Sequence, residues 1–453
     1  MSEVSEEAHT GQHSDCTCCK QKKDFSVPQE IIDAVTGGKL VVFACAGIST
    51  ENSNVFYWNL IDEIKEDVGI SDDENVSFAN AMGAFEEKFG RKELLQRIKK
   101  RFDYAEAFPE LYRRAVSFHR ELFTIHTVKE IFTTNWDDYF EKECGAISIS
   151  SDEDFRFWDL PQRKVFKLHG SVSSYGSIVA TEKDYKKRYK QLRDGAIGAS
   201  LKLSLATKTM VFFGYSFSDN DFDKIYSFLK KSMGDAMPKI YIVSPNPKDP
   251  AKLEKYNAIG IDTDGTFFLS KLKEFLVKEK KLVPDENFEF VEVGLLMIQK
   301  EHFKLGKEPY ILLENPESLY LASYQDGILH AFERMLTMKK DGSYSCPCYV
   351  MKLIESYERG KKLGRKERRY HDVAYYEGYK MGLTYLLATE ETREYFPMYY
   401  LYGHGPIVKE EEYMELSKKA ESLHKAAYKW AKGWIKYHNI TSSDTVFQHT
   451  PFA

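Results

Sequence analysis

Amide, carboxylate and imidazole side chains follow two apolar runs of this sequence. The stretch IFTTNWDDY, residues 131–139, contains Asn135, which can hold a hydroxyl group or a water molecule, and Asp137 two residues later. The run KVFKLHGSV contains His169, and an imidazole is the side chain best suited to take a proton from a hydroxyl group near neutral pH. Such residues suit a reaction that orients a nucleophile and moves a proton. Two simpler explanations remain open, because Asn135 can also cap the next helix and His169 can also pack in a core.

A third stretch, ACAGIS at residues 44–49, is made of small residues directly after the apolar run LVVFA. Small side chains at Ala46, Gly47 and Ser49 let the backbone approach a phosphate, and the helix that follows offers its N–H groups and positive dipole end. A tight turn from strand to helix also needs small residues. The stretch alone therefore does not distinguish nucleotide binding from turn geometry.

The elements that must position these residues are buried strands alternating with helices. Apolar runs rich in β-branched and aromatic residues predict strands within residues 40–44, 127–135, 164–172, 207–214 and 238–243. Helical periodicity separates them, for example in residues 78–89, 92–102 and 108–122. This alternation predicts an α/β fold with a Rossmann-like, doubly wound parallel sheet. Ligands of such sheets bind beyond the carboxyl ends of the strands, where each polar cluster of this sequence lies.

Four motifs occur in a defined order along the chain: AGIS at 46–49, TTNWD at 133–137, KLHG at 167–170, and GYS at 214–216 with Asp219. Together they resemble the sirtuin-like NAD-binding domain, in the branch found in bacterial anti-phage defence proteins. The resemblance covers residues 28–285. It implies a Rossmann-like fold that holds NAD+ and a site that breaks the nicotinamide–ribose bond.

The resemblance also implies roles for individual residues. Asn135 and His169 would be catalytic: Asn135 would hold a ribose hydroxyl or a water, and His169 would lie against the nicotinamide ribose. Trp136 and Asp137 resemble the residues that receive the nicotinamide amide. The other NAD+-binding residues are expected to be Ala46, Gly47, Ser49, Thr134, Gly214, Ser216 and Asn246.

The cysteines depart from the pattern of sirtuin deacylases. Those enzymes carry a zinc ribbon of two C-x-x-C pairs after the histidine motif, whereas this sequence has no cysteine between Cys144 and Cys346. Cys16, Cys18 and Cys19 are too closely spaced for a tetrahedral zinc site. We therefore expect no structural zinc and no metal in the site, and we expect water rather than acetyl-lysine as the acceptor.

Three functions from different classes fit these motifs. The first is an NAD+ hydrolase that releases nicotinamide and ADP-ribose and depletes NAD+ in anti-phage defence by abortive infection. The second is a sensor that binds NAD+ or ADP-ribose and gates a partner, and the third is an ADP-ribosyl or deacyl transferase. Asn135 and His169 favour hydrolysis. The relatives are often encoded with a HerA-type motor ATPase, and this sequence has no P-loop motif of its own. We therefore expect a separate partner of this kind and a homo-oligomer.

The two ends of the chain differ in composition from the predicted α/β domain. Residues 1–27 are polar and predict a disordered tail, and residues 286–453 predict a mainly helical domain for oligomerisation or partner contact. Near the C-terminus, large and small apolar residues recur at steps of three and four, which is typical of a heptad stripe. Such a stripe packs within its own domain or against another subunit. Its members are Tyr413, Leu416, Ala420, Leu423, Ala427, Trp430, Trp434 and Tyr437.

Composition excludes several classes of protein. A chain of 453 residues with 43% hydrophobic residues is long enough for two or three domains with sizeable cores. Its net charge of −5 argues against a general nucleic-acid binder, so nucleic acid would act at most indirectly. No apolar run reaches the roughly 18 residues of a membrane span, and the N-terminus lacks the apolar core of a signal peptide. Seven cysteines, an odd number, fit a reducing cytoplasm.

Overall fold

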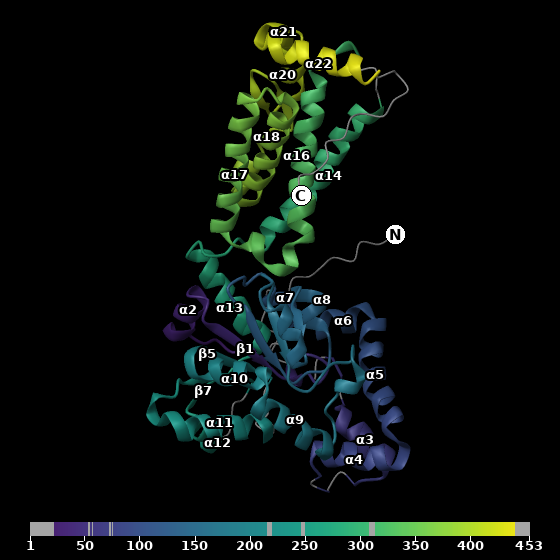
Figure 1. The fold of residues 1–453 in the computed structure, drawn as a ribbon, viewed down its shortest axis with the longest axis vertical. Coiled ribbons are helices and arrows are strands. Elements are labelled where there is room, and N and C mark those ends of the chain that lie inside the picture. Colours follow the sequence, from purple (N-terminus) through teal and green to yellow (C-terminus); the bar gives the residue numbers. More distant parts are fainter. Residues whose placement is uncertain are drawn as a thin grey trace. The chain divides into compact units, whose positions relative to one another are not determined.

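The computed structural model of the protein describes residues 22–52, 55–56, 58–71, 74, 76–214, 220–245, 250–307 and 313–439. Contacts between residues divide the chain into two compact units, Met1–Leu276 and Val277–Ala453 (Figure 1). The first unit contains the sheet and the second is mostly helical (Figure 1). The division falls shortly before the boundary expected between residues 285 and 286.

The first unit is built on a seven-stranded sheet in which every pair of neighbours is parallel. The strand order is β3-β4-β2-β1-β5-β6-β7, so the expected Rossmann-like, doubly wound sheet is confirmed. Two edge strands, β3 and β7, were not predicted because they are short and β7 contains a glycine. The strands are β1 Leu40–Ala44, β2 Glu130–Thr133, β3 Ile147–Ile149, β4 Lys164–Lys167, β5 Thr209–Phe213, β6 Ile240–Val243 and β7 Ala258–Ile261.

Helices cover both faces of this sheet, which explains why its strands read as continuous apolar runs. On one face, Phe43 and Phe212 stack with ring centroids 4.5 Å apart and pack against Phe222 of α11. On the other face, Phe213 contacts the ring of Phe118 in α7 and that of Phe268 in α13. The helices of the two faces include α2 Gln29–Thr36, α7 Ser117–Leu122, α8 Tyr139–Cys144, α9 Glu182–Asp194, α10 Ala196–Thr207, α11 Asn220–Met233, α12 Pro250–Lys255 and α13 Gly265–Lys278.

A small helical module lies between β1 and β2 in the chain. It consists of α3 Leu60–Val68, α4 Phe78–Phe89, α5 Arg91–Ala107 and α6 Pro109–Ala115. Ile64, Met82, Leu94 and Ile98 form part of its buried core, and the indole of Trp136 packs against the same core. The module therefore attaches directly to the segment that follows β2.

Part of the segment predicted as a tail packs on the first unit. Residues 1–21 lie outside the described residues, but Phe25 stacks on Phe268 of α13 with ring centroids 5.1 Å apart. The hydroxyl of Thr263 donates to the carbonyl of Lys23 at 2.9 Å. Residues 22–27 thus contribute to the packing of α13.

In the second unit, the long helices α14, α16, α17 and α18 run alongside one another (Figure 1). Gly327 and Gly378 allow α16 and α18 to touch, because a Cβ at Gly327 would lie 2.2 Å from the carbonyl oxygen of Tyr375. Many of the buried side chains are tyrosines. The elements are α14 Glu286–Lys307, α16 Ser318–Thr337, α17 Pro347–Lys366, α18 Tyr370–Leu387, α19 Glu390–Arg393, the antiparallel pair β8 Tyr399–Leu401 and β9 Gly405–Ile407, α20 Glu410–Ser417, α21 Ala420–Leu423 and α22 Lys425–Tyr437.

The predicted heptad stripe is not one continuous helix. It is divided among α20, α21 and α22, and Tyr437 at its end is 81% exposed. Ala427 and Ala431 of α22 are buried in the core of the second unit, and Trp430 and Trp434 are partly buried against the same core. Two helix ends, at Lys418–Lys419 and at His424, interrupt the stripe. The spacing of three and four residues continues across them, so the periodicity of the sequence did not reveal them.

Within the described part of the chain, no helix combines the length and the apolar character required to cross a bilayer.

Candidate functional site

The strands that carry the four motifs are neighbours in the sheet. The order β4-β2-β1-β5 brings the ends of these strands, and hence residues 46–49, 133–137, 167–170 and Gly214, to one edge. The chain continues from β1 toward β2 on one side and from β5 toward β6 on the other. The edge between β1 and β5 is therefore the topological switch point, where doubly wound sheets bind ligands.

Two of the predicted residues, Gly47 and Gly214, meet at this switch point. A Cβ at Gly47 would lie 3.0 Å from the Cα of Gly214, and a Cβ at Gly214 would lie 2.8 Å from the nitrogen of Ile48. Gly214 also has a φ of +62°, which favours glycine. Ala46 and Gly47 belong to a short 3-10 helix, Ala46–Ile48, directly after β1. The close contact of two backbones explains both glycines and leaves main-chain groups at the edge of the sheet.

Asn135 is buried beyond β2, with only 4% of its surface exposed. Its main-chain N–H donates to the hydroxyl of Thr133 at 3.0 Å, and its side-chain Nδ2 donates to the hydroxyl of Ser49 at 3.4 Å. Its amide oxygen Oδ1 is buried and has no hydrogen-bond partner among the described residues. Asn135 does not cap α8, whose N-cap position is Asp138. The structure thus leaves a buried acceptor at the predicted site.

Asp137 is fully buried and connected to the same serine. Ser49 donates from its hydroxyl to Oδ2 of Asp137 at 3.0 Å, and the N–H of Tyr139 donates to Oδ1 at 3.3 Å. Burial raises the pKa of this carboxyl, while the charge of Lys167 and the two hydrogen bonds lower it. Ser49 therefore links Asn135 and Asp137, so three predicted residues form one buried network.

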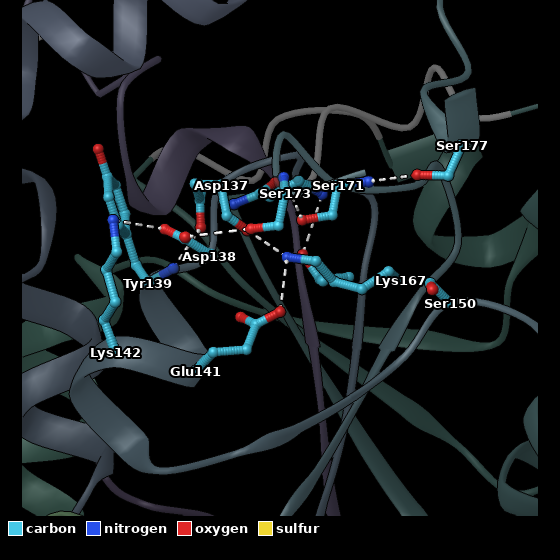
Figure 2. Close-up of polar contacts among 12 residues, drawn as sticks. Asp137, Asp138, Tyr139, Glu141, Lys142, Ser150, Lys167, Ser171, Ser173 and Ser177 are labelled. Atoms are coloured by element: carbon cyan, nitrogen blue, oxygen red, sulfur yellow. Dashed lines mark hydrogen bonds and ion pairs between the residues drawn. The ribbon is translucent and has the colours of Figure 1, made fainter. Parts of the chain in front are cut away.

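Lys167 is the residue of this network that sequence reasoning did not assign. Its side chain is 0% exposed and extends from the end of β4 toward Asp137 and α8 (Figure 2). Its ammonium group donates to the main-chain carbonyl of Asp137 and lies 3.5 Å from Oε1 of Glu141. The available signal was a lysine within the apolar run that precedes the histidine.

His169 leaves β4 at the same level at which Asn135 leaves β2. Thr133 and Lys167 are paired in the parallel register, and each of the two residues follows its strand by two positions. His169 is 5% exposed, and its ring meets that of Tyr185 edge-on at a centroid distance of 5.0 Å. Gly170 follows with a φ of +82°, where a Cβ would lie 2.1 Å from the carbonyl oxygen of Ser177. The chain therefore turns sharply after His169.

Hydroxyl groups line the turn after His169, another feature that the sequence did not suggest. Ser171 accepts a hydrogen bond from the N–H of Ser173 at 3.2 Å, and the hydroxyl of Ser173 donates to Asp138 at 3.2 Å (Figure 2). Asp138 also pairs with Lys142 of α8 at 2.9 Å. The turn after β4 is thus fastened to the segment after β2.

The remaining predicted residues have mixed outcomes. The N–H of Thr134 donates to the carbonyl of Ala44 at 3.3 Å, which ties the ends of β1 and β2 together. The ring of Trp136 lies 5.9 Å from that of Phe78, so Trp136 anchors α4. Ser216 and Asn246 lie outside the described residues.

Two other histidines have structural environments. His119 is 0% exposed, its ring is 4.4 Å from that of Phe140, and burial lowers its pKa to about 3. Burial also lowers the pKa of His126 to about 4. Both imidazoles are therefore neutral near pH 7.

The described residues contain no group of three or more histidine, cysteine, aspartate or glutamate side chains arranged to hold a metal ion. Cys16, Cys18 and Cys19 lie outside them. The expectation of no structural zinc stays a prediction.

Comparisons with known proteins agree with the fold and the motifs. Residues 129–263 match the family model of the SIR2-like domain, and this segment contains Asn135 and His169. The chain is similar to the protein named NAD(+) hydrolase ThsA of Cytobacillus dafuensis, with 25% identity over 212 residues, 46% of this chain and 41% of that protein. Identity to the ThsA protein of Enterococcus faecium is 23% over 205 residues, 44% of this chain and 41% of the relative. Identity to Defense-associated sirtuin 2 of Bacillus subtilis is 23% over 247 residues, 52% of this chain and 23% of the relative. The chain therefore spans less than half the length of these relatives.

Proposed function

We propose that this protein hydrolyses NAD+ at the nicotinamide–ribose bond, giving nicotinamide and ADP-ribose, and that it depletes NAD+ as the effector of an anti-phage defence system. The observation that carries the proposal is the buried amide oxygen of Asn135, which has no partner among the described residues. A buried acceptor without a partner costs about 1–3 kcal/mol, and a ligand donor can remove this cost. A ribose hydroxyl or a water molecule is such a donor.

The reaction breaks the bond between C1′ of the ribose and the nicotinamide nitrogen, and both bonding electrons leave with nicotinamide. Positive charge develops on the ribose, and water attacks C1′ and loses a proton. Asn135 would hold the ribose hydroxyl or the attacking water, which is a contribution of position. His169 would accept the proton, because an imidazole with an ordinary pKa of about 6.5 is well matched to neutral pH.

The network around Asp137 supports the nicotinamide end of this assignment. Asp137 and Trp136 occupy the positions that the resemblance gives to recognition of the carboxamide. Gly47 and Gly214 support a phosphate position at the switch point, since their close contact leaves no side chain there. Ser216 and Asn246 stay part of the proposed NAD+ site.

Asn135→Ala and His169→Ala test the proposal directly. Each variant should lose about 10²–10⁴-fold in nicotinamide release, measured by mass spectrometry of the products of NAD+. Unfolding free energy should fall by no more than about 1–2 kcal/mol, and NAD+ should still bind. His126→Gln, a histidine outside the site, should retain turnover. Wild-type turnover in both site variants would place the chemistry elsewhere.

The proposal includes a homo-oligomer and a separate HerA-type ATPase, both supported by the resemblance. Product analysis should therefore be made with and without such a partner, and the molar mass should be measured by light scattering. Binding of NAD+ without any release of nicotinamide, in either condition, would favour the sensor function instead. A modified protein product would favour transfer.

A further inference from the structure

We infer that Lys167 is a positioning residue for the reaction at this site: it fixes the segment Thr133–Asp138, and with it the amide of Asn135, from the neighbouring strand. The inference deepens the proposed function and rests on it for its consequence in turnover. Lys167 belongs to β4 and Asn135 follows β2, so the contact ties two strands together at their ends.

The contact that carries the inference goes to the main chain. The ammonium group of Lys167 donates to the carbonyl of Asp137, two residues after Asn135 (Figure 2). That carbonyl lies beyond the end of β2 and outside the ladder between β2 and β4, so the lysine supplies a restraint there that the sheet does not. An ion pair with Glu141 at 3.5 Å orients the lysine from α8.

The position of Asp137 then determines that of Asn135 through Ser49. The hydroxyl of Ser49 donates to Asp137 at 3.0 Å and accepts from the amide nitrogen of Asn135 at 3.4 Å. A hydroxyl has one hydrogen, so its use toward Asp137 leaves its lone pairs for Asn135. Because the Ser49 hydroxyl accepts from Asn135, Nδ2 of Asn135 points toward Ser49, and Oδ1 is left as the buried acceptor.

The partners of Lys167 compensate for its burial. An ammonium group with 0% exposure is costly unless it is paired and hydrogen-bonded. Asp137 is itself buried, and the positive charge favours its ionised form, the form that accepts from Ser49. The titratable groups that face this pair are Asp138 on the same segment, Glu141 on α8 and the neutral imidazole of His119 on α7.

Lys167→Met removes the charge and the donor at nearly constant length. We expect nicotinamide release to fall at least tenfold in kcat, with a smaller change in KM for NAD+, since the lysine touches the segment and not the substrate. The acid limb of the pH profile of kcat should move to higher pH, because Asp137 loses the counter-charge that lowers its pKa. Lys273→Met is the matched control: this lysine of the same unit is also largely buried and pairs with Glu121 at 2.9 Å, and its loss should move neither quantity.

A second variant separates position from folding. Lys167→Met combined with Glu141→Gln removes one carboxylate together with the buried cation, and should recover thermal stability without recovering kcat. Recovery of thermal stability together with kcat would overturn the inference. Failure of the single and the double variant to fold would also overturn it, because Lys167 would then be required for the fold alone. An unchanged kcat and pH profile in Lys167→Met would also overturn it.

Hydrogen exchange provides a reading that does not depend on turnover. Amides of residues 133–139 should exchange faster in Lys167→Met than in wild type, and at the wild-type rate in Lys273→Met. If wild type releases no nicotinamide with any partner, the proposed function fails, and the exchange rates alone decide whether Lys167 holds the segment. Unchanged exchange would overturn the inference even if wild type hydrolyses NAD+.

Discussion

At the scale of single residues, the site depends on hydrogen bonds that side chains make to side chains across strands. Ser49 comes from the turn after β1, whereas Asn135 and Asp137 come from the segment after β2. A serine between an amide and a buried carboxylate transmits the position of one to the other. The arrangement differs from a helix cap, which would have used Asn135 locally.

Ser49→Ala tests this link. The variant leaves the buried Asp137 without one of its donors, so unfolding free energy should fall by about 1–3 kcal/mol. Nicotinamide release should fall by about tenfold to a hundredfold, because Nδ2 of Asn135 loses its acceptor and the amide can turn. Denaturant titration and product analysis measure the two effects.

Ser204→Ala is the matched control for Ser49. Ser204 is 2% exposed and donates to Glu130 at 2.9 Å on a helix away from the strand ends. It should show a comparable loss of stability with normal turnover per folded molecule. Equal turnover in the two variants would contradict the role given to Ser49.

At the scale of elements, a buried arginine attaches the helical module α3–α6 to the site, in addition to the packing of Trp136. The guanidinium of Arg101 on α5 pairs with Glu51 at 2.7 Å and Glu63 at 3.1 Å, and donates to the carbonyls of Thr50 and Trp58. Thr50 and Glu51 directly follow Ser49. The module thus holds the far end of the turn that carries Ser49.

Arg101→Met should cost about 3–5 kcal/mol of unfolding free energy, since it removes a buried cation and leaves the partly buried Glu51 without its partner. Burial raises the pKa of Glu51, whereas the charge and hydrogen bond of Arg101 lower it, so loss of the arginine should raise this pKa further. Arg97→Met, on the same helix and 29% exposed with partners Glu63 and Asp67, should cost less than about 1 kcal/mol. Equal costs in thermal or denaturant unfolding would refute the attachment.

The element α22 contains the tryptophans of the interrupted stripe. Trp430 stacks on His371 with ring centroids 5.0 Å apart, and Trp434 packs against the same core. Replacing both by lysine should cost several kcal/mol and give poorly soluble protein. Tyr437→Lys, which changes an 81% exposed residue of the same stripe, should be neutral. A soluble double variant of lower molar mass in light scattering would instead identify a subunit contact.

At the scale of the whole molecule, the part of the N-terminal segment that packs on the first unit begins between residues 21 and 25. Phe25 lies against Phe267 and Phe268, and Lys23 pairs with Asp262 at 2.5 Å. These contacts hold the segment on α13, the last helix of the sheet-containing unit.

Two deletions test this boundary. Removal of residues 1–21 should leave the melting temperature and NAD+ turnover unchanged. Removal of residues 1–25 should lower the melting temperature, because burial of one aromatic ring contributes about 1.5–3 kcal/mol. Calorimetry of the two variants beside the full chain measures the difference, and identical melting temperatures for all three would contradict it.

The sequence by itself determined the doubly wound sheet, since continuous apolar runs between helical segments have few other solutions. It also placed Asn135, His169 and the glycines at strand ends, because each of these residues directly follows an apolar run that predicts a strand. The tertiary structure alone decided which ends are neighbours, that Gly47 faces Gly214, and that Lys167 reaches Asp137 from another strand. These are contacts between residues far apart in the chain, and their geometry follows from strand order and side-chain burial, which a linear pattern does not encode. For the same reason, the three-and-four spacing of the C-terminal stripe did not reveal that its helix ends twice.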